Sequence, residues 1–462
     1  MIHSAGSPGC KDFSFLLCTI QQCTIRVWET RVLRFLFPIV SGKMEGPEDQ
    51  VNGAQVKYES LALDTALSTL VVIMVYVAVK LSMDSVRQWR ARVSILVVGA
   101  GPVGLTAALV AVRSGKVLNL TVLDERSRAG LLCRPQQIAL DPRSVSFLLG
   151  LGVDFDNIEG CWHNDHFFTK IGVFQEHLLS ILEQRKQALD IRISLGTKFT
   201  EEYTRKIPQR EWPKIIVVAD GSCGESSSLL GVCSEYIVES CNAYGANAAL
   251  ERPDQRQVPT PEIRAHNLYF DLSAYGIDVN NAGKETTSHQ LGMKPGFHLK
   301  IYGTFRNRYM ALACPSSDAK IVRFLRYTPN SSIMKNIFHE SFNAYKTDIE
   351  PRVSDLTLPH LQCSRRLVEI LLSHRRVTAA FIEGENIAVT LEGEAARVLN
   401  FDTGCGVNLG LRGLESSEEF IYKVATAVDQ NDIFDALAAK IKHSKQVVQD
   451  FRFHGLSATV FE

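Results

Sequence analysis

The chain lacks several patterns that mark specialised classes of protein. Its 50 Lys and Arg residues balance its 50 Asp and Glu residues, so net charge gives no reason to expect nucleic-acid binding. Its 31 Gly and 16 Pro residues exclude collagen-like and low-complexity classes. Its 11 Cys residues include no CxxC pair or repeated Cys/His spacing, which argues against a disulfide framework and a metal site. These observations leave an ordinary folded protein of 462 residues, with two or three domains and reduced cytosolic thiols.

The first 60 residues form an amino-terminal tail that carries no long apolar period. One interpretation is a targeting peptide, because Arg26, Arg31 and Arg34 outnumber the acidic residues nearby. The other interpretation is that translation starts at Met44 and that the preceding residues are artefactual. Both interpretations stay open at the level of sequence.

Residues 61–83 are a candidate transmembrane helix. Thr65–Val79 contains no charged residue. A helix over the whole stretch would reach about 34 Å at ~1.5 Å per residue, enough for a hydrocarbon core of ~30 Å. Its apolar residues lie on every side of the helix, which argues against a membrane-surface helix. A buried core helix is the alternative.

Flanking charges predict the orientation of this segment. Residues 46–60 contain one basic residue, Lys57, whereas the downstream flank carries Lys80, Arg87, Arg90 and Arg92. Since basic flanks favour the cytoplasmic side, the rest of the chain is expected to face the cytosol. The lipid bilayer is therefore an expected partner, contacted through one helix.

A dinucleotide-binding pattern begins after the basic flank. An apolar run over residues 93–98 ends in a Gly-x-Gly-x-x-Gly turn, and a helix of small residues follows. Gly99 permits the tight turn, Gly101 lets a pyrophosphate approach the backbone, and Gly104 lets helix and strand pack closely. The next strand ends in Asp124, at the spacing of a carboxylate that binds ribose hydroxyls. Glu125 takes that role if the strand register slips by one residue.

Three motifs follow in order. Arg134 opens a stretch that leads into a helix ending in Leu-Gly, Asp220-Gly221 follows an apolar strand, and Gly393-Glu394 precedes a glycine-rich loop. Together with the glycine turn they span residues 93 to about 425 and resemble the class A flavoprotein monooxygenases of the 4-hydroxybenzoate hydroxylase type. They also show some resemblance to the flavin domain of MICAL proteins. The resemblance implies bound FAD, with NADPH as a transient reductant.

The resemblance also implies roles for individual residues. It places Arg134 at the FAD pyrophosphate, Asp220 at FAD and NADPH, and Glu394 at the ribityl chain. The glycine-rich loop and the helix after it would approach the pyrimidine edge of the flavin through Gly404, Gly406, Val407 and Asn408. Backbone N–H groups at that helix start would stabilise a reduced, anionic flavin. No catalytic side chain is assigned, because the flavin supplies the reactive atom.

The expected fold is α/β. A Rossmann-like FAD-binding domain is expected in residues 93–231 and 386–462, with an inserted antiparallel-sheet substrate domain in residues 232–385. One transmembrane helix precedes them. Alternating stretches such as Gly296–Tyr302 predict the inserted strands. A helix is expected at Cys363–Leu372.

The leading functional hypothesis is a membrane-anchored monooxygenase that uses NADPH and O2 to hydroxylate an organic substrate, which the sequence does not identify. The alternative is a flavin-fold protein with weakened catalysis that serves as a membrane-tethered binding or scaffold module. Ser227 motivates this alternative, because it stands where the Asp-Gly motif usually has arginine.

Overall fold

The computed structural model describes residues 51–451, except residues 135, 164, 209–210, 233–236, 253–261, 269–296, 304–305, 316–319, 328–330, 355–357 and 402–405. The chain divides into two compact units, Met1–Met83 and Asp84–Glu462. The expected targeting peptide and the possible start at Met44 both lie outside the described residues. The expected mixed α/β fold, with a parallel sheet and antiparallel sheets, is confirmed.

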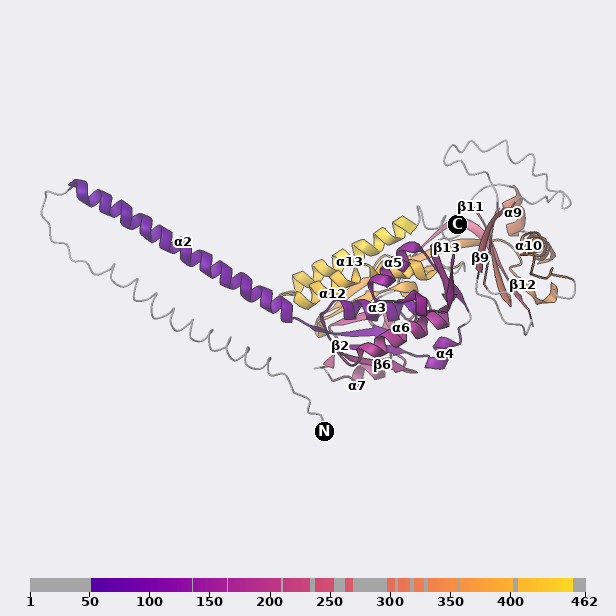
Figure 1. Ribbon diagram of the computed structural model, residues 1–462, viewed down its shortest axis with the longest axis horizontal. Helices are drawn as coiled ribbons and strands as arrows, with labels where there is room; N and C mark the ends of the chain where they lie inside the picture. Colours follow the sequence, from indigo (N-terminus) through magenta and orange to yellow (C-terminus); the bar gives the residue numbers. More distant parts are fainter. Residues whose placement is uncertain are drawn as a thin grey trace. The chain divides into compact units, whose positions relative to one another are not determined.

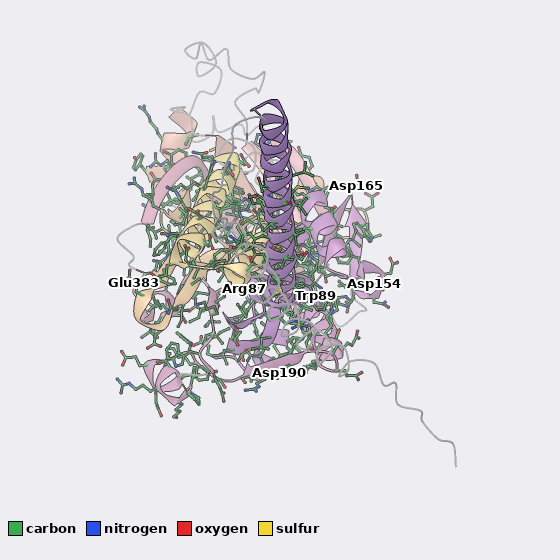
Figure 2. All side chains as sticks on the ribbon, turned by 90° about the vertical axis from the view of Figure 1, so that its left-hand side faces the viewer. Arg87, Trp89, Asp154, Asp165, Asp190 and Glu383 are labelled. Carbon is green, nitrogen blue, oxygen red and sulfur yellow. The ribbon has the colours of Figure 1, made fainter. Side chains whose placement is uncertain are left out.

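Helix α2 (Val51–Arg90) contains the expected membrane segment and extends beyond it on both sides. Residues Thr65–Arg90 are long and apolar enough to cross a membrane, and they are exposed among the residues that the structure describes. One such helix is weak evidence for a span, because a signal sequence or a soluble core helix passes the same test. The last turns of α2 carry exposed Arg87 and Trp89 (Figure 2).

The first sheet of the second unit has the strand order β14-β15-β7-β1-β2-β6. Its strands are β1 (Val93–Val98), β2 (Val117–Asp124), β6 (Asp190–Leu195), β7 (Ile215–Val218), β14 (Ala379–Ile382) and β15 (Ile387–Leu391). All neighbours pair in parallel except β14, which runs antiparallel to β15. The central strands β1 and β7 read as continuous apolar runs because both faces of the sheet are buried.

Helices cover one face of this sheet and supply much of its core (Figure 1). The longer ones are α3 (Pro102–Arg113), α6 (Ile171–Arg185), α12 (Ser417–Thr426) and α13 (Gln430–Asp450). Shorter helices complete the loops: α4 (Arg128–Leu132), α5 (Pro142–Gly150), α7 (Glu201–Lys206), α8 (Ser226–Leu229) and α11 (Gly406–Leu414). Phe199 and Val232 pack with strand side chains on the opposite face.

The second sheet is antiparallel, with the order β16-β13-β8-β11-β10-β9, and β12 pairs with β8. Its strands are β8 (Ile237–Glu251), β9 (Glu262–Leu268), β10 (Phe297–Gly303), β11 (Asn307–Pro315), β12 (Leu361–Cys363), β13 (Val368–Arg375) and β16 (Arg397–Leu399). Helices α9 (Lys320–Tyr327) and α10 (Ser331–Tyr345) pack on one face. Residues of α11 and α13 pack on the other.

The chain crosses between the two sheets on both sides of residue 386, where the carboxy-terminal part of the FAD-binding domain was expected to begin. Strand β14 precedes this residue but belongs to the first sheet, whereas β16 follows it and belongs to the second. A small third sheet has the order β3-β5-β4, formed by β3 (Gln137–Leu140), β4 (Gly160–His163) and β5 (His166–Lys170).

The expected helix at Cys363–Leu372 is wrong, because most of the stretch belongs to strands β12 and β13. Ile370 and Leu372 are buried two positions apart, which is the spacing of one face of a strand. Strand β13 pairs with β8 along its whole length and with β16 at its end. Pairing on both sides decides the structure of this segment.

Candidate functional site

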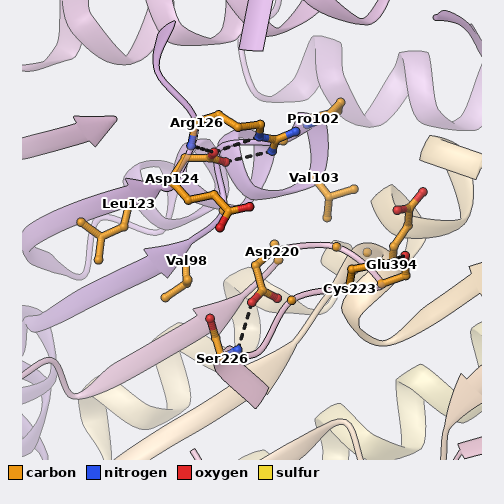
Figure 3. A pocket seen from close by; sticks show the side chains of 18 of the residues that line it. Val98, Pro102, Val103, Leu123, Asp124, Arg126, Asp220, Cys223, Ser226 and Glu394 are labelled. Atoms are coloured by element: carbon orange, nitrogen blue, oxygen red, sulfur yellow. Dashed lines mark hydrogen bonds and ion pairs between the residues drawn. The ribbon is translucent and has the colours of Figure 1, made fainter. Parts of the chain in front are cut away.

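A cavity of about 330 Å³ opens at the carboxyl ends of the parallel strands β1, β2 and β7 (Figure 3). Open α/β sheets bind ligands at this edge, because the loops after neighbouring strands meet there. Of the predicted site residues, the cavity is lined by Gly99, Gly101, Asp124, Glu125, Arg134, Asp220, Glu394, Gly406 and Val407. These residues come from distant parts of the sequence and converge on one space.

The three glycines after β1 have different surroundings. A Cβ on Gly99, whose φ is +105°, would lie 2.3 Å from the carbonyl oxygen of Ala219. A Cβ on Gly104 would lie 1.8 Å from the carbonyl oxygen of Gly99. A Cβ on Gly101 would meet no atom within 4 Å. Gly99 and Gly104 are therefore required by backbone packing, whereas the space at Gly101 is open to a ligand.

The Asp124 carboxylate is occupied by protein groups. It accepts hydrogen bonds from the backbone N–H of Ala100 at 2.7 Å and of Arg126 at 2.8 Å, and from the Arg126 guanidinium at 3.0 Å to each oxygen. Burial alone would raise the pKa of Asp124, but these hydrogen bonds outweigh it and lower the pKa. Asp124 therefore fixes the glycine turn, while exposed Glu125 beside it lines the cavity.

Arg134 brings a positive charge to the cavity. Its side chain is partly buried, and its guanidinium forms no ion pair with a carboxylate among the residues that the structure describes. Burial lowers the pKa of Arg134, the neighbouring charge of Arg126 lowers it further, and the carboxylates of Glu394 and Asp124 offset part of the shift. Arginine stays protonated in proteins despite such a shift. A half-buried guanidinium that lines a cavity suits an anionic ligand.

The loop after β7 presents a second carboxylate. The backbone N–H of Ser226 donates to Oδ2 of Asp220 at 3.2 Å. Oδ1 of Asp220 is buried and accepts no hydrogen bond from the described part of the chain. A Cβ on Gly224 would lie 2.0 Å from the Asp220 carboxylate, so glycine at this position lets the loop close around it. Asp220 therefore has one buried oxygen without a hydrogen-bond partner among the described residues.

The carboxy-terminal motif divides between cavity and scaffold. Glu394 is exposed on the short turn η9 (Gly393–Ala395) and lines the cavity with Gly406 and Val407, where α11 begins. Asn408 does not line it. The Asn408 side chain is buried and joins α11 to two backbone groups, the carbonyl of Ala139 at 2.8 Å and the N–H of Asp141 at 3.2 Å. Gly404 lies outside the described residues.

Gln175 is a supporting residue that the motifs did not predict. It is buried on α6, and its Nε2 donates to the carbonyl of Ala100 at 2.9 Å. Asp124 accepts from the N–H of the same residue, so side chains from β2 and α6 hold both polar groups of Ala100. In the sequence, Gln175 is an amide side chain among the apolar residues Phe174, Leu178 and Leu182, a pattern that indicates a buried polar group with a hydrogen-bonding role.

No protein-family model and no curated protein matches this chain. Among solved structures, it is similar to the peptidyl tryptophan dihydroxylase QhpG, with 11% identity, a TM-score of 0.47, and coverage of 78% of this chain and 73% of that one. It is similar to 2-methyl-3-hydroxypyridine-5-carboxylic acid oxygenase, with 14% identity, a TM-score of 0.46, and coverage of 80% of this chain and 93% of that one. It is also similar to CtdE in complex with FAD, with 10% identity, a TM-score of 0.41, and coverage of 78% of this chain and 91% of that one.

Replacing Asp124 by asparagine should lower the free energy of unfolding at pH 7 by about 1.5–3 kcal/mol, because charge-assisted hydrogen bonds are lost. Glu125→Gln, the matched control, should change it by less than about 0.5 kcal/mol. The folded-state pKa of Asp124 is depressed, so its contribution is present above the unfolded pKa near ~3.9 and is lost as pH falls through the folded pKa. Urea unfolding at several pH values measures this. Equal stability of the two variants at pH 7 would contradict the assignment.

Proposed function

We propose that this chain binds FAD in the cavity beside β1 and acts as a flavin-dependent monooxygenase. The observation that carries the proposal is the convergence of an open glycine cradle, the Arg134 guanidinium and three carboxylates, those of Glu125, Asp220 and Glu394, on one cavity. FAD requires this combination, because it carries a pyrophosphate between two hydroxyl-bearing chains. The motif resemblance supports the same cofactor.

The cavity residues can each be matched to a part of FAD. Glu125 would accept hydrogen bonds from the ribose hydroxyls, because Asp124 is already occupied. The pyrophosphate would lie against Gly101 and the start of α3, with Arg134 as its counter-ion. Asp220 and Glu394 would accept from ribityl hydroxyls, and the amino-terminal end of α11 at Gly406 would face the flavin ring.

Bound FAD would supply the chemistry, since it accepts electrons from NADPH and passes them to O2 so that an organic substrate is hydroxylated. The chain would bind and orient the cofactor and exclude water. The positive end of the α11 dipole would stabilise negative charge that develops on the flavin ring.

A direct test is the absorbance spectrum of the purified chain with a Gly101→Val variant. The wild-type chain should carry flavin, and Gly101→Val should lose it because the branched side chain fills the open cradle. Gly384→Val is the matched control. A Cβ on Gly384 would also meet no atom within 4 Å, but this residue lies outside the cavity, so the variant should retain flavin. Equal flavin content in all three would count against the site.

NADPH separates the enzyme from the scaffold alternative. We expect anaerobic NADPH to bleach the flavin absorbance of the wild-type chain, and air to restore it. Ser227 favours the scaffold alternative, since it replaces the usual arginine of the Asp-Gly motif. Stopped-flow absorbance measures the reduction. Flavin that is bound but that NADPH and NADH both leave oxidised would favour the binding or scaffold module.

We further propose that α2 anchors the protein in a membrane with the FAD-binding unit in the cytosol. The length and apolar surface of Thr65–Arg90 and the basic residues of its carboxy-terminal flank support this. Removing residues 1–83 should release a soluble, flavin-loaded protein, because the remaining residues form one compact unit. Ultracentrifugation of cell membranes measures the release. A truncated chain that stays in the membrane pellet would refute the anchor.

A further inference from the structure

Arg375 lies at the end of β13 and contacts two loops of the cavity wall. Its Nε donates to the carbonyl of Ala395 at 3.0 Å, and its backbone N–H donates to the carbonyl of Ala396 at 2.9 Å. Its Nη2 donates to the hydroxyl of Ser227 at 3.2 Å. Its Nη1 reaches the carbonyl of Val232 at 3.5 Å. One side chain therefore joins the segment after β15 to the segment after β7.

Both loops carry carboxylates that line the cavity. Ala395 follows Glu394 directly on the turn η9, and Ser227 follows the loop that holds Asp220. Arg375 itself does not line the cavity. It acts from the second sheet, because β13 pairs with β8 and β16. Any effect of Arg375 on a ligand must therefore pass through the loops that it holds.

The guanidinium suits this task because its donors form a rigid planar fork. The fork reaches Ala395 with Nε and Ser227 with Nη2 at the same time. A lysine has one nitrogen on a flexible stem and cannot hold both acceptors in fixed geometry. The spacing between the Asp220 loop and η9 therefore depends on the guanidinium shape and not only on its charge.

We propose that Arg375 is a positioning residue that sets the distance between Asp220 and Glu394 for the ribityl chain of FAD. It would couple the second sheet to the cofactor cavity, in the place where the Asp-Gly loop carries Ser227 instead of an arginine. This inference rests on the proposed FAD site.

The test compares FAD affinity in the full chain, measured by titrating FAD into apo protein and following flavin fluorescence. Arg375→Lys keeps the charge and should weaken FAD binding by about tenfold. Arg376→Lys is the matched control on the next residue, which is exposed, and should bind FAD like the wild type. The melting temperature of each apo protein checks folding. Arg375→Gln, which keeps one donor, replaces Arg375→Lys if the latter does not fold.

A double-variant cycle with Glu394→Gln separates positioning from general stability. If Arg375 acts through Glu394, the double variant should bind FAD with about the same affinity as the single variant that binds FAD more weakly. Both changes then remove the same contact, that of Glu394 with the ribityl chain. Fully additive losses would overturn the inference, as would FAD affinity of Arg375→Lys within about twofold of the wild type. A wild-type chain that binds no FAD would overturn the proposed function itself, and this inference with it.

Discussion

Three backbone segments meet at the carboxyl end of β1 with no room for a side chain. The turn at Gly99 lies against the carbonyl of Ala219, and α3 starts so close to the turn that Gly104 can carry no Cβ. Every loop of the cavity is positioned from this contact. It brings the end of β7 beside the end of β1 and directs the start of α3 at the space between them. The close backbone contacts fall at Gly99 and Gly104, and the position of Gly101 between them stays open.

Polar groups around this junction divide into those that the protein uses and those that it leaves for a ligand. Asp124 and Gln175 direct hydrogen bonds to Ala100, which keeps the turn in place. Arg134 and Oδ1 of Asp220 lack such protein partners within the described chain. The second group is a buried acceptor without a hydrogen bond, which is costly.

Sequence patterns predicted the parallel sheet, the glycine turn and most cavity residues, because these depend on local spacing and on continuous apolar runs. They favoured Asp124 over Glu125 by its spacing, which does not show that protein groups already occupy the Asp124 carboxylate. They assigned Asn408 to the helix start beside the flavin, and its side-chain amide joins α11 to β3 and to Asp141, the residue before α5. Spacing does not encode which groups pack around a side chain. For the same reason the helix expected at Cys363–Leu372 is mostly strand, since β8 and β16, distant in sequence, pair with β13 and bring Arg375 to the cavity wall.

A buried ion cluster fixes the other end of the loop that Arg375 holds. Glu392, two residues before Glu394, is buried with Lys440 at 2.6 Å and Arg397 at 3.7 Å. Lys440 also donates to the carbonyl of Gly413 at 2.9 Å, near the end of α11. Removing one partner of such a buried cluster typically costs about 3–5 kcal/mol, so its geometry is strongly held. Glu394 thus lies between two anchored points, Glu392 and the Ala395 carbonyl bound by Arg375. The chain is thereby held on both sides of this exposed residue at the cavity wall.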